Sequence, residues 1–459
     1  MAKNKKTLDE LLQEAIVKDA PYEVPGNWVW SNINTISSEI KNGTTIKQNK
    51  EVNGIKVTRI ESIQNNTIDF KRIGYVVDNS KIKDKDYYKN GDIALSHINS
   101  IEHVGKTALI TEKMLPLIHG MNLLRIRFYK QLINPQLFQL YTQSYDFKKE
   151  VVNKVNRAVN QVSLNQKMLS QIKFPIPPLK EQERIVQKIE GLFEKLDKAK
   201  KLIEEVREDF EKRKASILEK AFRGELTEKW REENKYLYEK QYFNIGEVCD
   251  INPKKDILNE IDNNTKCTFV PMASVNHING KADVHLTKLY SDVKKGYTFF
   301  KEDDILFAKI TPCMENGKTA IVKGLINKFG FGSTEFHVIR CKNNVLNKYI
   351  YYLLRSKMFR NLAKQNMTGA VGQQRVPKDF IQHYNIWLPP LEEQKEIVRI
   401  LDKLLDEENK IEKLTNLENQ IELTKKSILA KAFRGELGTN DPSEESAMEL
   451  LKEVLQEKL

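Results

Sequence analysis

The sequence Pro177-Pro178-Leu179-Lys180-Glu181-Gln182 returns further along the chain as Pro389-Pro390-Leu391-Glu392-Glu393-Gln394. The first proline of each pair holds the residue before it extended, and the second suits the first turn of a helix. Carboxylates follow at once, where the helix dipole favours negative charge. Each of the two stretches therefore predicts the start of a helix.

Apolar residues after both starts recur at alternating spacings of four and three, which is the pattern of a coiled-coil seam. The first seam comprises Ile185, Ile189, Leu192, Leu196, Ala199, Ile203, Val206, Phe210 and Ile217. The second comprises Ile397, Leu401, Leu404, Ile411, Leu414, Leu417, Ile421 and Ile428. A cation and a glycine end each helix, at Arg223-Gly224 and Arg434-Gly435. About 43 residues give each helix a length of about 65 Å. Since a helix with one apolar seam needs a partner, we expect the two helices to pair with each other, antiparallel.

The repeat extends beyond the helices. Residues 104–110 match residues 316–322 around a shared Gly-Lys-Thr-Ala, at an offset of 212. The same offset maps Gln161 onto Gln373 and Ala199 onto Ile411, and it falls to 211 from Ile203 onward. One constant offset over about 160 residues indicates a tandem duplication of one unit, a globular half followed by a helix.

The predicted fold class is α+β, with two mixed α/β globular halves separated by two long antiparallel coiled-coil helices. β-rich runs such as 305–308 and 336–339 are bounded by turn residues, and one helix is expected over 347–365. The predicted segments are an N-terminal helix and lead-in (1–27), a first globular domain (28–176), a long helix with linker (177–240), a second globular domain (241–388), a second long helix (389–438) and a C-terminal tail and helix (439–459).

Composition narrows the functional classes. The 459 residues, 40% of them hydrophobic, can form two to four cores. The sequence contains no run of about 18 uncharged apolar residues and no apolar signal-peptide core, and its four cysteines lack CxxC spacing. We therefore expect a cytoplasmic protein without a transmembrane helix, disulfide scaffold or cysteine-rich zinc site.

The positive charge is concentrated in the globular halves. Residues 28–175 hold 22 basic and 12 acidic residues, and residues 242–387 hold 21 and 13, so their net charges are +10 and +8. Since the whole chain carries +12, the helices and termini carry −6. Two basic modules joined by a rigid spacer favour a long polyanion such as DNA as the partner, although solvated lysines would also explain the excess.

Several motifs resemble catalytic sites without completing them. Gly105-Lys106-Thr107 and Gly317-Lys318-Thr319 lack the glycine that a P-loop needs five residues earlier, so each predicts a turn between strands. The seven histidines show no HExxH or HxH pairing, and we find no amino-methyltransferase tetrad, GxSxG or metal-nuclease carboxylate cluster. The sequence therefore predicts a protein without catalytic residues and without a metal site.

Taken together, these motifs resemble the DNA-specificity subunit of type I restriction–modification systems. The resemblance rests on the two Pro-Pro-Leu-x-Glu-Gln starts and on the helix ends Lys-Ala-Phe-Arg-Gly-Glu-Leu at 220–226 and 431–437. Stretches 269–272, 304–318, 332–336 and 372–375 resemble that family's target-recognition domain. The first half departs more, since Ala94-Leu95-Ser96-His97 stands in place of Leu306-Phe307-Ala308-Lys309.

This resemblance implies a protein of the bacterial or archaeal cytoplasm that shares its work with other subunits. Each recognition domain would read one half of a split double-stranded DNA target, and the helices would set the spacer. Two methyltransferase (modification) subunits would supply S-adenosylmethionine and adenine methylation, and two motor-nuclease (restriction) subunits would supply ATP, Mg and cleavage. The chain itself would bind no cofactor and no membrane, and it would be no enzyme.

Candidate DNA-binding residues are polar and lie in Gly/Asn-rich loops at matching positions of the two halves. Lys and Arg neutralise phosphates, Gln can bridge adenine, and Arg can bridge guanine. The candidates are Lys41, Thr44, Thr45, Lys47, His97, Asn99, Asn160, Gln161, Lys309, Thr311, Asn316, Gln373, Gln374 and Arg375. Two alternatives stay open at this point: a single-chain DNA methyltransferase or nuclease with its own recognition domains, and a coiled-coil scaffold with no role at DNA.

Overall fold

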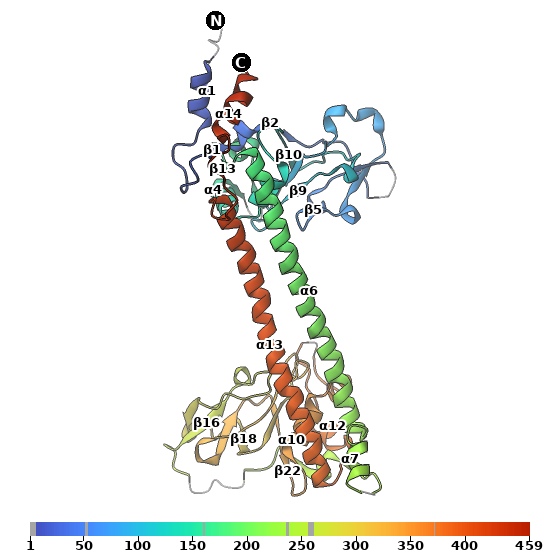
Figure 1. The fold of residues 1–459 in the computed structure, drawn as a ribbon. Helices are drawn as coiled ribbons and strands as arrows, with labels where there is room; N and C mark the ends of the chain where they lie inside the picture. Colours follow the sequence, from blue (N-terminus) through green and yellow to red (C-terminus); the bar gives the residue numbers. More distant parts are fainter. Residues whose placement is uncertain (1–5, 51–53, 159–160, 236–237, 256–260, 371) are drawn as a thin grey trace. The chain divides into compact units, whose positions relative to one another are not determined.

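The computed structural model describes residues 6–50, 54–158, 161–235, 238–255, 261–370 and 372–459 (Figure 1). The chain divides into two compact units, Met1–Lys200 with Glu418–Leu459 and Lys201–Leu417. Within the described ranges, no helix has the length and hydrophobicity needed to cross a bilayer.

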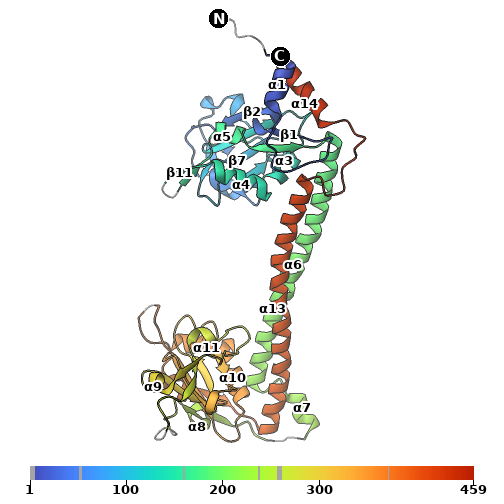
Figure 2. The same cartoon turned by 90° about the vertical axis from the view of Figure 1, so that its left-hand side faces the viewer.

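The two predicted long helices are α6 (Leu179–Arg223) and α13 (Leu391–Phe433). In the first unit, Asp197 of α6 pairs with Lys425 of α13, and Lys200 pairs with Glu422, so the partner moves back along α13 as the position advances along α6. In the second unit, Phe210 and Leu218 of α6 share a core with Leu401 and Leu404 of α13. The antiparallel pairing is therefore confirmed in each unit, and both views show the helices side by side (Figures 1 and 2).

The predicted seam is wrong at two positions. The side chains of Val206 and Leu417 are 49% and 42% exposed, whereas Phe210 and Ile421 are buried. Two helices without a third packing element cover the side chains that point directly at the partner and leave flanking seam positions in solvent. The side chain of Ile411 lies outside the described residues.

The glutamine of each helix-start motif fastens the helix to its own globular half. Gln182 donates from Nε2 to the carbonyl oxygens of Leu132 and Pro177, at 2.8 and 2.9 Å, and its Oε1 accepts from the Asn134 N–H at 2.7 Å. Gln394 makes the corresponding three hydrogen bonds with Asn344, Pro389 and Leu346. Both side chains are buried, so the motif has a structural role in both units.

The glutamate of each motif is also fully buried. Glu181 accepts hydrogen bonds from Trp28, Thr439 and Asn440, and therefore joins the N-terminal lead-in to the C-terminal tail. Glu393 accepts from Thr227, Arg231 and Tyr238 of the segment that follows α6. Each buried carboxylate is thus satisfied by donors from a distant segment of its own unit, as burial of such a charge requires.

Each unit contains a four-stranded antiparallel sheet, in the order β2-β10-β7-β9 in the first and β15-β22-β19-β20 in the second. The strands are β2 Ser37–Asn42, β7 Ile93–Ser96, β9 Thr107–Leu109, β10 Leu123–Phe128, β15 Cys249–Ile251, β19 Ile305–Ala308, β20 Thr319–Ile321 and β22 Phe336–Cys341. The predicted strands 305–308 and 336–339 are confirmed, and so are the two mixed α/β halves of one design.

Two-stranded pairs close each half where it meets its helix. They join β1 (Val29–Asn32) to β13 (Lys173–Ile176) and β14 (Tyr242–Asn244) to β23 (Asn385–Trp387). The two globular halves differ in the smaller sheets that accompany the shared four-stranded sheet. The second unit has a further mixed sheet, in the order β17 (Thr287–Leu289), β16 (Lys266–Val270), β21 (Phe329–Gly332), β18 (Thr298–Lys301). The first has short pairs of β3 (Ile55–Val57) with β6 (Gly74–Val76) and β4 (Ile63–Gln64) with β5 (Thr67–Ile68).

The single helix expected over 347–365 is wrong, because two helices form there, α10 (Asn347–Arg355) and α11 (Lys357–Gln365). Ser356 breaks them with an extended backbone, and its hydroxyl caps α11 by accepting from the Phe359 N–H at 3.2 Å. Ser144 caps α4 (Tyr145–Lys154) after α3 (Pro135–Tyr141) in the same way, so the break is part of the repeat. Shorter helices complete the halves: α2 Ile33–Ile36, α5 Gln166–Ser170, α7 Glu228–Glu233, α8 Ile245–Val248, α9 Tyr290–Val293 and α12 Lys378–Gln382.

The two terminal helices, α1 (Leu8–Ala15) and α14 (Ala447–Gln456), pack against each other in the first unit (Figure 1). Their apolar faces join the core that contains Ile185 and Ile189 of α6 and Phe433 of α13. Helices from opposite ends of the sequence thus share one core with the helix pair. Their sequences are alike, Glu-Leu-Leu-Gln-Glu-Ala-Ile at 10–16 and Glu-Leu-Leu-Lys-Glu-Val-Leu at 449–455.

Candidate nucleic-acid interface

The structure brings five of the six candidate residues of the second half together on a short two-stranded ladder, which we call ladder 2 (residues 309–311 and 373–376). The sixth, Asn316, lies in the turn that follows, where its N–H donates to the Pro312 carbonyl. The Val376 N–H donates to the Lys309 carbonyl at 2.9 Å, and the Thr311 N–H donates to the Gln374 carbonyl at 3.0 Å. Ile310 and Arg375 form the bridge between them. Lys309 and Thr311 thus lie beside Gln373, Gln374 and Arg375, although about 60 residues separate the two stretches in sequence.

The first half contains the same arrangement, ladder 1 (residues 97–99 and 161–164). It consists of β8 (Ile98–Asn99) and β12 (Gln161–Ser163), extended by a hydrogen bond from the Leu164 N–H to the His97 carbonyl at 2.8 Å. Every pairing of ladder 2 has its counterpart here at the offset of 212. β11 (Asn156–Ala158) extends this sheet. The repeated ladder places polar side chains at matching positions on the two basic halves.

Arg375 is held in place by Glu335. Its Nε and Nη2 donate to the two carboxylate oxygens of Glu335, both at 2.9 Å, and Nη1 donates to the Gln373 carbonyl at 3.1 Å. The guanidinium beside Glu335 lowers the pKa of that carboxyl. An arginine has five N–H donors, so two donors, one each on Nη1 and Nη2, are left over from these bonds. A fork of this kind matches O6 and N7 of guanine.

Glu335 is the residue that the sequence prediction missed. It lies in the Gly332-Ser333-Thr334-Glu335-Phe336 stretch, directly before β22, but its partner Arg375 is 40 residues away. Before β10, Asn122 occupies the matching place in the first half, and Ser163 matches Arg375. The two ladders therefore present different chemistry in the same geometry.

The other candidate residues of the second half vary in exposure. Gln373 on ladder 2 and Asn316 outside it are exposed, whereas Lys309, Thr311 and Gln374 are half-buried. The Oγ1 atom of Thr311 is buried and has no hydrogen-bond partner among the described residues. The backbone hydrogen bonds of ladder 2 hold Lys309, Thr311 and Gln374 in fixed positions.

In ladder 1, His97 is half-buried and burial lowers its pKa, so its imidazole is neutral near pH 7. The Asn99 amide bonds locally, to Ser96 Oγ at 3.2 Å and to the Ser100 N–H at 2.8 Å. Gln161 is exposed, and Asn160 lies outside the described residues.

The candidates around Gly43 lie at the end of β2, near ladder 1. The Gly43 N–H donates to the Leu123 carbonyl, and Leu123 pairs with Ser96, the neighbour of His97. Thr44 is half-buried and bridges Gly120, and Lys41 Nζ is 3.6 Å from Glu39. Thr45 and Lys47 are exposed, and exposed lysine and threonine side chains suit phosphate contacts.

The two Gly-Lys-Thr motifs are turns, as predicted. Gly105 and Gly317 have φ angles of 79° and 78°, which favour glycine, and Thr107 and Thr319 begin β9 and β20. Among the residues that the structure describes, no group of three His, Cys, Asp or Glu side chains is placed to hold a metal ion.

Comparisons with known proteins agree with this architecture. Residues 25–208 and 238–423 match a family model described as the type I restriction modification DNA specificity domain. The MjaX type I restriction enzyme specificity subunit of Methanocaldococcus jannaschii is 31% identical, and the match covers 90% of this chain and 95% of that protein. The EcoEI specificity subunit of Escherichia coli is 34% identical, over 48% of this chain and 44% of that protein, so the chain matches less than half of that relative's length.

Two solved structures share the fold. A chain from work on complex assembly and conformational transition of the type I R-M system has a TM-score of 0.66 at 19% identity, covering 91% of this chain and 100% of that chain. The HsdS subunit from Thermoanaerobacter tengcongensis has a TM-score of 0.57 at 18% identity, covering 92% and 100%.

Proposed function

The chain belongs to the family of type I restriction–modification DNA specificity subunits, and from this premise we propose that each globular half reads one half of a split DNA target. The observation that carries the proposal is the repeated ladder, with His97, Asn99 and Gln161 on one half and Lys309, Gln374 and Arg375 on the other. Matching backbones with different side chains suit two readers that share a mode of docking and differ in the bases they select.

Charge supports the same proposal. The halves carry +10 and +8, and Thr45 and Lys47 are exposed in the segment that follows β2. Lysine and arginine would neutralise phosphates and set the register, while the ladder side chains contact base edges. The family places this chain among non-catalytic recognition subunits, which leaves the single-chain methyltransferase or nuclease and the DNA-free scaffold without a supporting observation.

We infer that other subunits perform the chemistry. In this proposal two modification subunits bring S-adenosylmethionine and methylate adenine, and two restriction subunits bring ATP and Mg for translocation and cleavage. The packed terminal helices α1 and α14 offer an exposed outer face for docking a modification subunit. Deletion of residues 445–459 should weaken that assembly in size-exclusion chromatography, and undiminished assembly would contradict this part of the proposal.

The helix pair would set the gap between the half-sites. Gln182 and Gln394 fix each globular half to the start of its own long helix, so a change in helix length changes where that half is held. DNA repeats about every 10–10.5 base pairs, and domains that face a groove tolerate little error in separation or rotation.

The test is the methylated sequence. The chain is produced with its modification subunits in a host without other adenine methylation, and modified adenines are mapped by sequencing. A split motif with two defined halves is the expected result. Exchanging residues 28–176 for the matching half of a relative should change one half of the motif and leave the other unchanged. Changes in both halves would refute the assignment of one half-site to each globular half.

A further inference from the structure

The hairpin of β11 and β12, which we call ribbon 1 (residues 156–158 and 161–163), lies at the outer edge of the first half (Figure 2). All three residues of β11 are exposed, and so is Gln161 on β12. Val162 of β12 is buried and belongs to the core of the first unit. A two-stranded hairpin is at best marginally stable on its own. Packing in the core therefore does not account for the residues of β11.

The two faces of ribbon 1 carry different side chains. Residues directly opposite each other in an antiparallel pair share a face, and the face alternates along each strand. The register of the pairing places four residues on one face: Asn156, Ala158, Gln161 and Ser163. Arg157 lies opposite Val162 on the other face. Because Val162 packs in the core, the face of Asn156 and Gln161 is directed away from the core.

The second half contains the same hairpin, ribbon 2 (residues 368–370 and 372–375). The Thr368 N–H donates to the Arg375 carbonyl at 3.0 Å, and the Arg375 N–H donates to the Thr368 carbonyl at 2.8 Å. At the offset of 212, the face that matches Asn156 and its neighbours carries Thr368, Ala370, Gln373 and Arg375. The face that holds the candidate guanine reader in the second half therefore carries the amides of Asn156 and Gln161 in the first.

The arginines of the two ribbons lie on opposite faces. Arg375 shares its face with Gln373, whereas Arg157 shares its face with Val162, and Gly369 stands in place of Arg157 in ribbon 2. Such a difference in position suits a difference in role.

The side chains of Asn156 and Arg157 are available to a partner. Among the residues that the structure describes, neither forms a hydrogen bond or an ion pair through its side chain, and both are exposed. An asparagine amide has donors and an acceptor, which match N6 and N7 of adenine as a glutamine amide does. An arginine has donors only, which suit a phosphate.

We propose that ribbon 1 enters the major groove of the first half-site, with Asn156 as a specificity-determining residue that reads adenine and Arg157 as a phosphate contact. The inference rests on the proposed function and deepens it. The major groove is about 12 Å wide and admits a two-stranded ribbon. Asn156 and Gln161 are diagonal neighbours across ribbon 1, about 7–8 Å apart. That distance is about two base-pair steps of about 3.4 Å, so the two amides would read positions about two base pairs apart.

The test compares variants of the chain, each produced with its modification subunits. Asn156→Ala should relax the methylated motif at one base pair of the first half-site, where the intact protein selects A·T, and leave the second half-site unchanged. Fluorescence anisotropy with cognate and singly substituted duplexes should show selectivity at that base pair reduced by about tenfold or more, as expected for one bidentate contact. Asn156→Gln retains the amide and should retain the preference for adenine with weaker binding.

Arg157→Gln should act differently from Asn156→Ala. It should weaken binding to cognate and scrambled duplexes by the same factor, and reduce the salt dependence of binding by about one phosphate contact, while the motif stays unchanged. The matched control is Asn153→Ala, which changes an exposed asparagine of α4 just outside ribbon 1 and should alter neither affinity nor motif.

The outcomes separate this inference from the proposed function. A split motif that Asn156→Ala leaves unchanged would overturn the inference alone. So would equal losses on cognate and scrambled DNA, or a change in the second half-site. An intact protein that gives no split motif would refute the proposed function, and the inference with it.

Discussion

Replacing Arg375 by alanine should weaken binding to the cognate DNA by about tenfold to hundredfold, while binding to random DNA changes little. Three of the five guanidinium donors are taken by Glu335 and Gln373, and the remaining two form the fork that can bridge one guanine. The expected loss is that of one bidentate base contact. The Arg375 side chain is 43% exposed, so its removal should have little effect on folding.

The assay is fluorescence anisotropy with the mapped motif and a scrambled duplex, at one fixed salt concentration. Glu335→Gln serves as the second variant, because it retains the side chain volume and removes the charge that holds the guanidinium. It should give a smaller loss in the same direction, with selectivity reduced at the same base pair. Equal loss on cognate and scrambled DNA would make Arg375 a phosphate contact and refute this reasoning.

Three further outcomes are expected. Gln394→Ala leaves buried backbone groups unpaired and should destabilise the second unit by about 1–3 kcal/mol in denaturant unfolding, whereas Glu392→Ala, on the exposed side of the same turn, should have little effect. One heptad inserted after Phe210 adds about 10 Å to α6 while keeping the seam in phase, so the mapped motif should show a longer gap with unchanged half-sites; an unchanged gap would show that the helices do not set it. Burial lowers the pKa of His119 to about 3, below its unfolded value near 6.5, so the unfolded chain binds the extra proton and stability falls as pH drops through that window. His119→Gln should therefore reduce the loss of thermal stability between pH 7 and pH 5, and an identical pH dependence would contradict this assignment.

The parts of the fold that the sequence predicted are those that depend on periodicity. The long helices, their pairing and the duplication follow from apolar spacing and a constant offset, which need no knowledge of tertiary contacts. The break at Ser356 was not predicted, although the sequence contains a signal for it. In both halves a serine stands three residues before a phenylalanine, Ser144 before Phe147 and Ser356 before Phe359, and each serine caps the start of a helix. The exposure of Val206 depends on what else packs beside the helix pair, and a seam pattern carries no such information.

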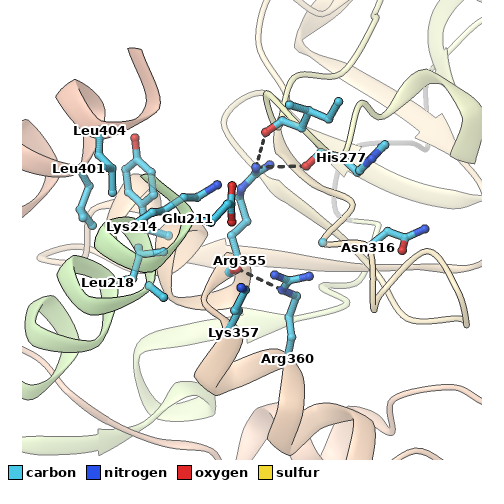
Figure 3. A pocket seen from close by; sticks show the side chains of 14 residues that line it. Glu211, Lys214, Leu218, His277, Asn316, Arg355, Lys357, Arg360, Leu401 and Leu404 are labelled. Carbon is cyan, nitrogen blue, oxygen red and sulfur yellow. Dashed lines mark hydrogen bonds between the residues drawn. The ribbon is translucent and has the colours of Figure 1, made fainter. Parts of the chain in front are cut away.

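The candidate site, too, was predicted only in the part that depends on the sequence repeat. The offset correctly aligned Gln161 with Gln373, and the structure places both on ladders. The salt bridge between Glu335 and Arg375 joins residues 40 positions apart, and the cavity at Arg355 in the second unit is lined by five separate segments of the chain (Figure 3). Such contacts are set by tertiary packing, and one sequence read along its length does not reveal them.

The buried carboxylates Glu181 and Glu393 are held in equivalent ways in the two units. Thr439 and Asn440 near the C-terminus do for Glu181 what Thr227 and its neighbours in the linker do for Glu393. Because α1 and α14 pack against each other, with the start of α1 and the end of α14 on the same side (Figures 1 and 2), a short peptide joining Gln456 to Leu8 would strain neither helix. A circular permutant with new ends in the linker after α7 would keep every donor to both carboxylates. An exchange of one globular half between relatives would likewise keep Thr439 and Asn440 on Glu181 and Thr227 on Glu393. Under the proposed function, such an exchange would give a new pair of half-sites without a new helical core.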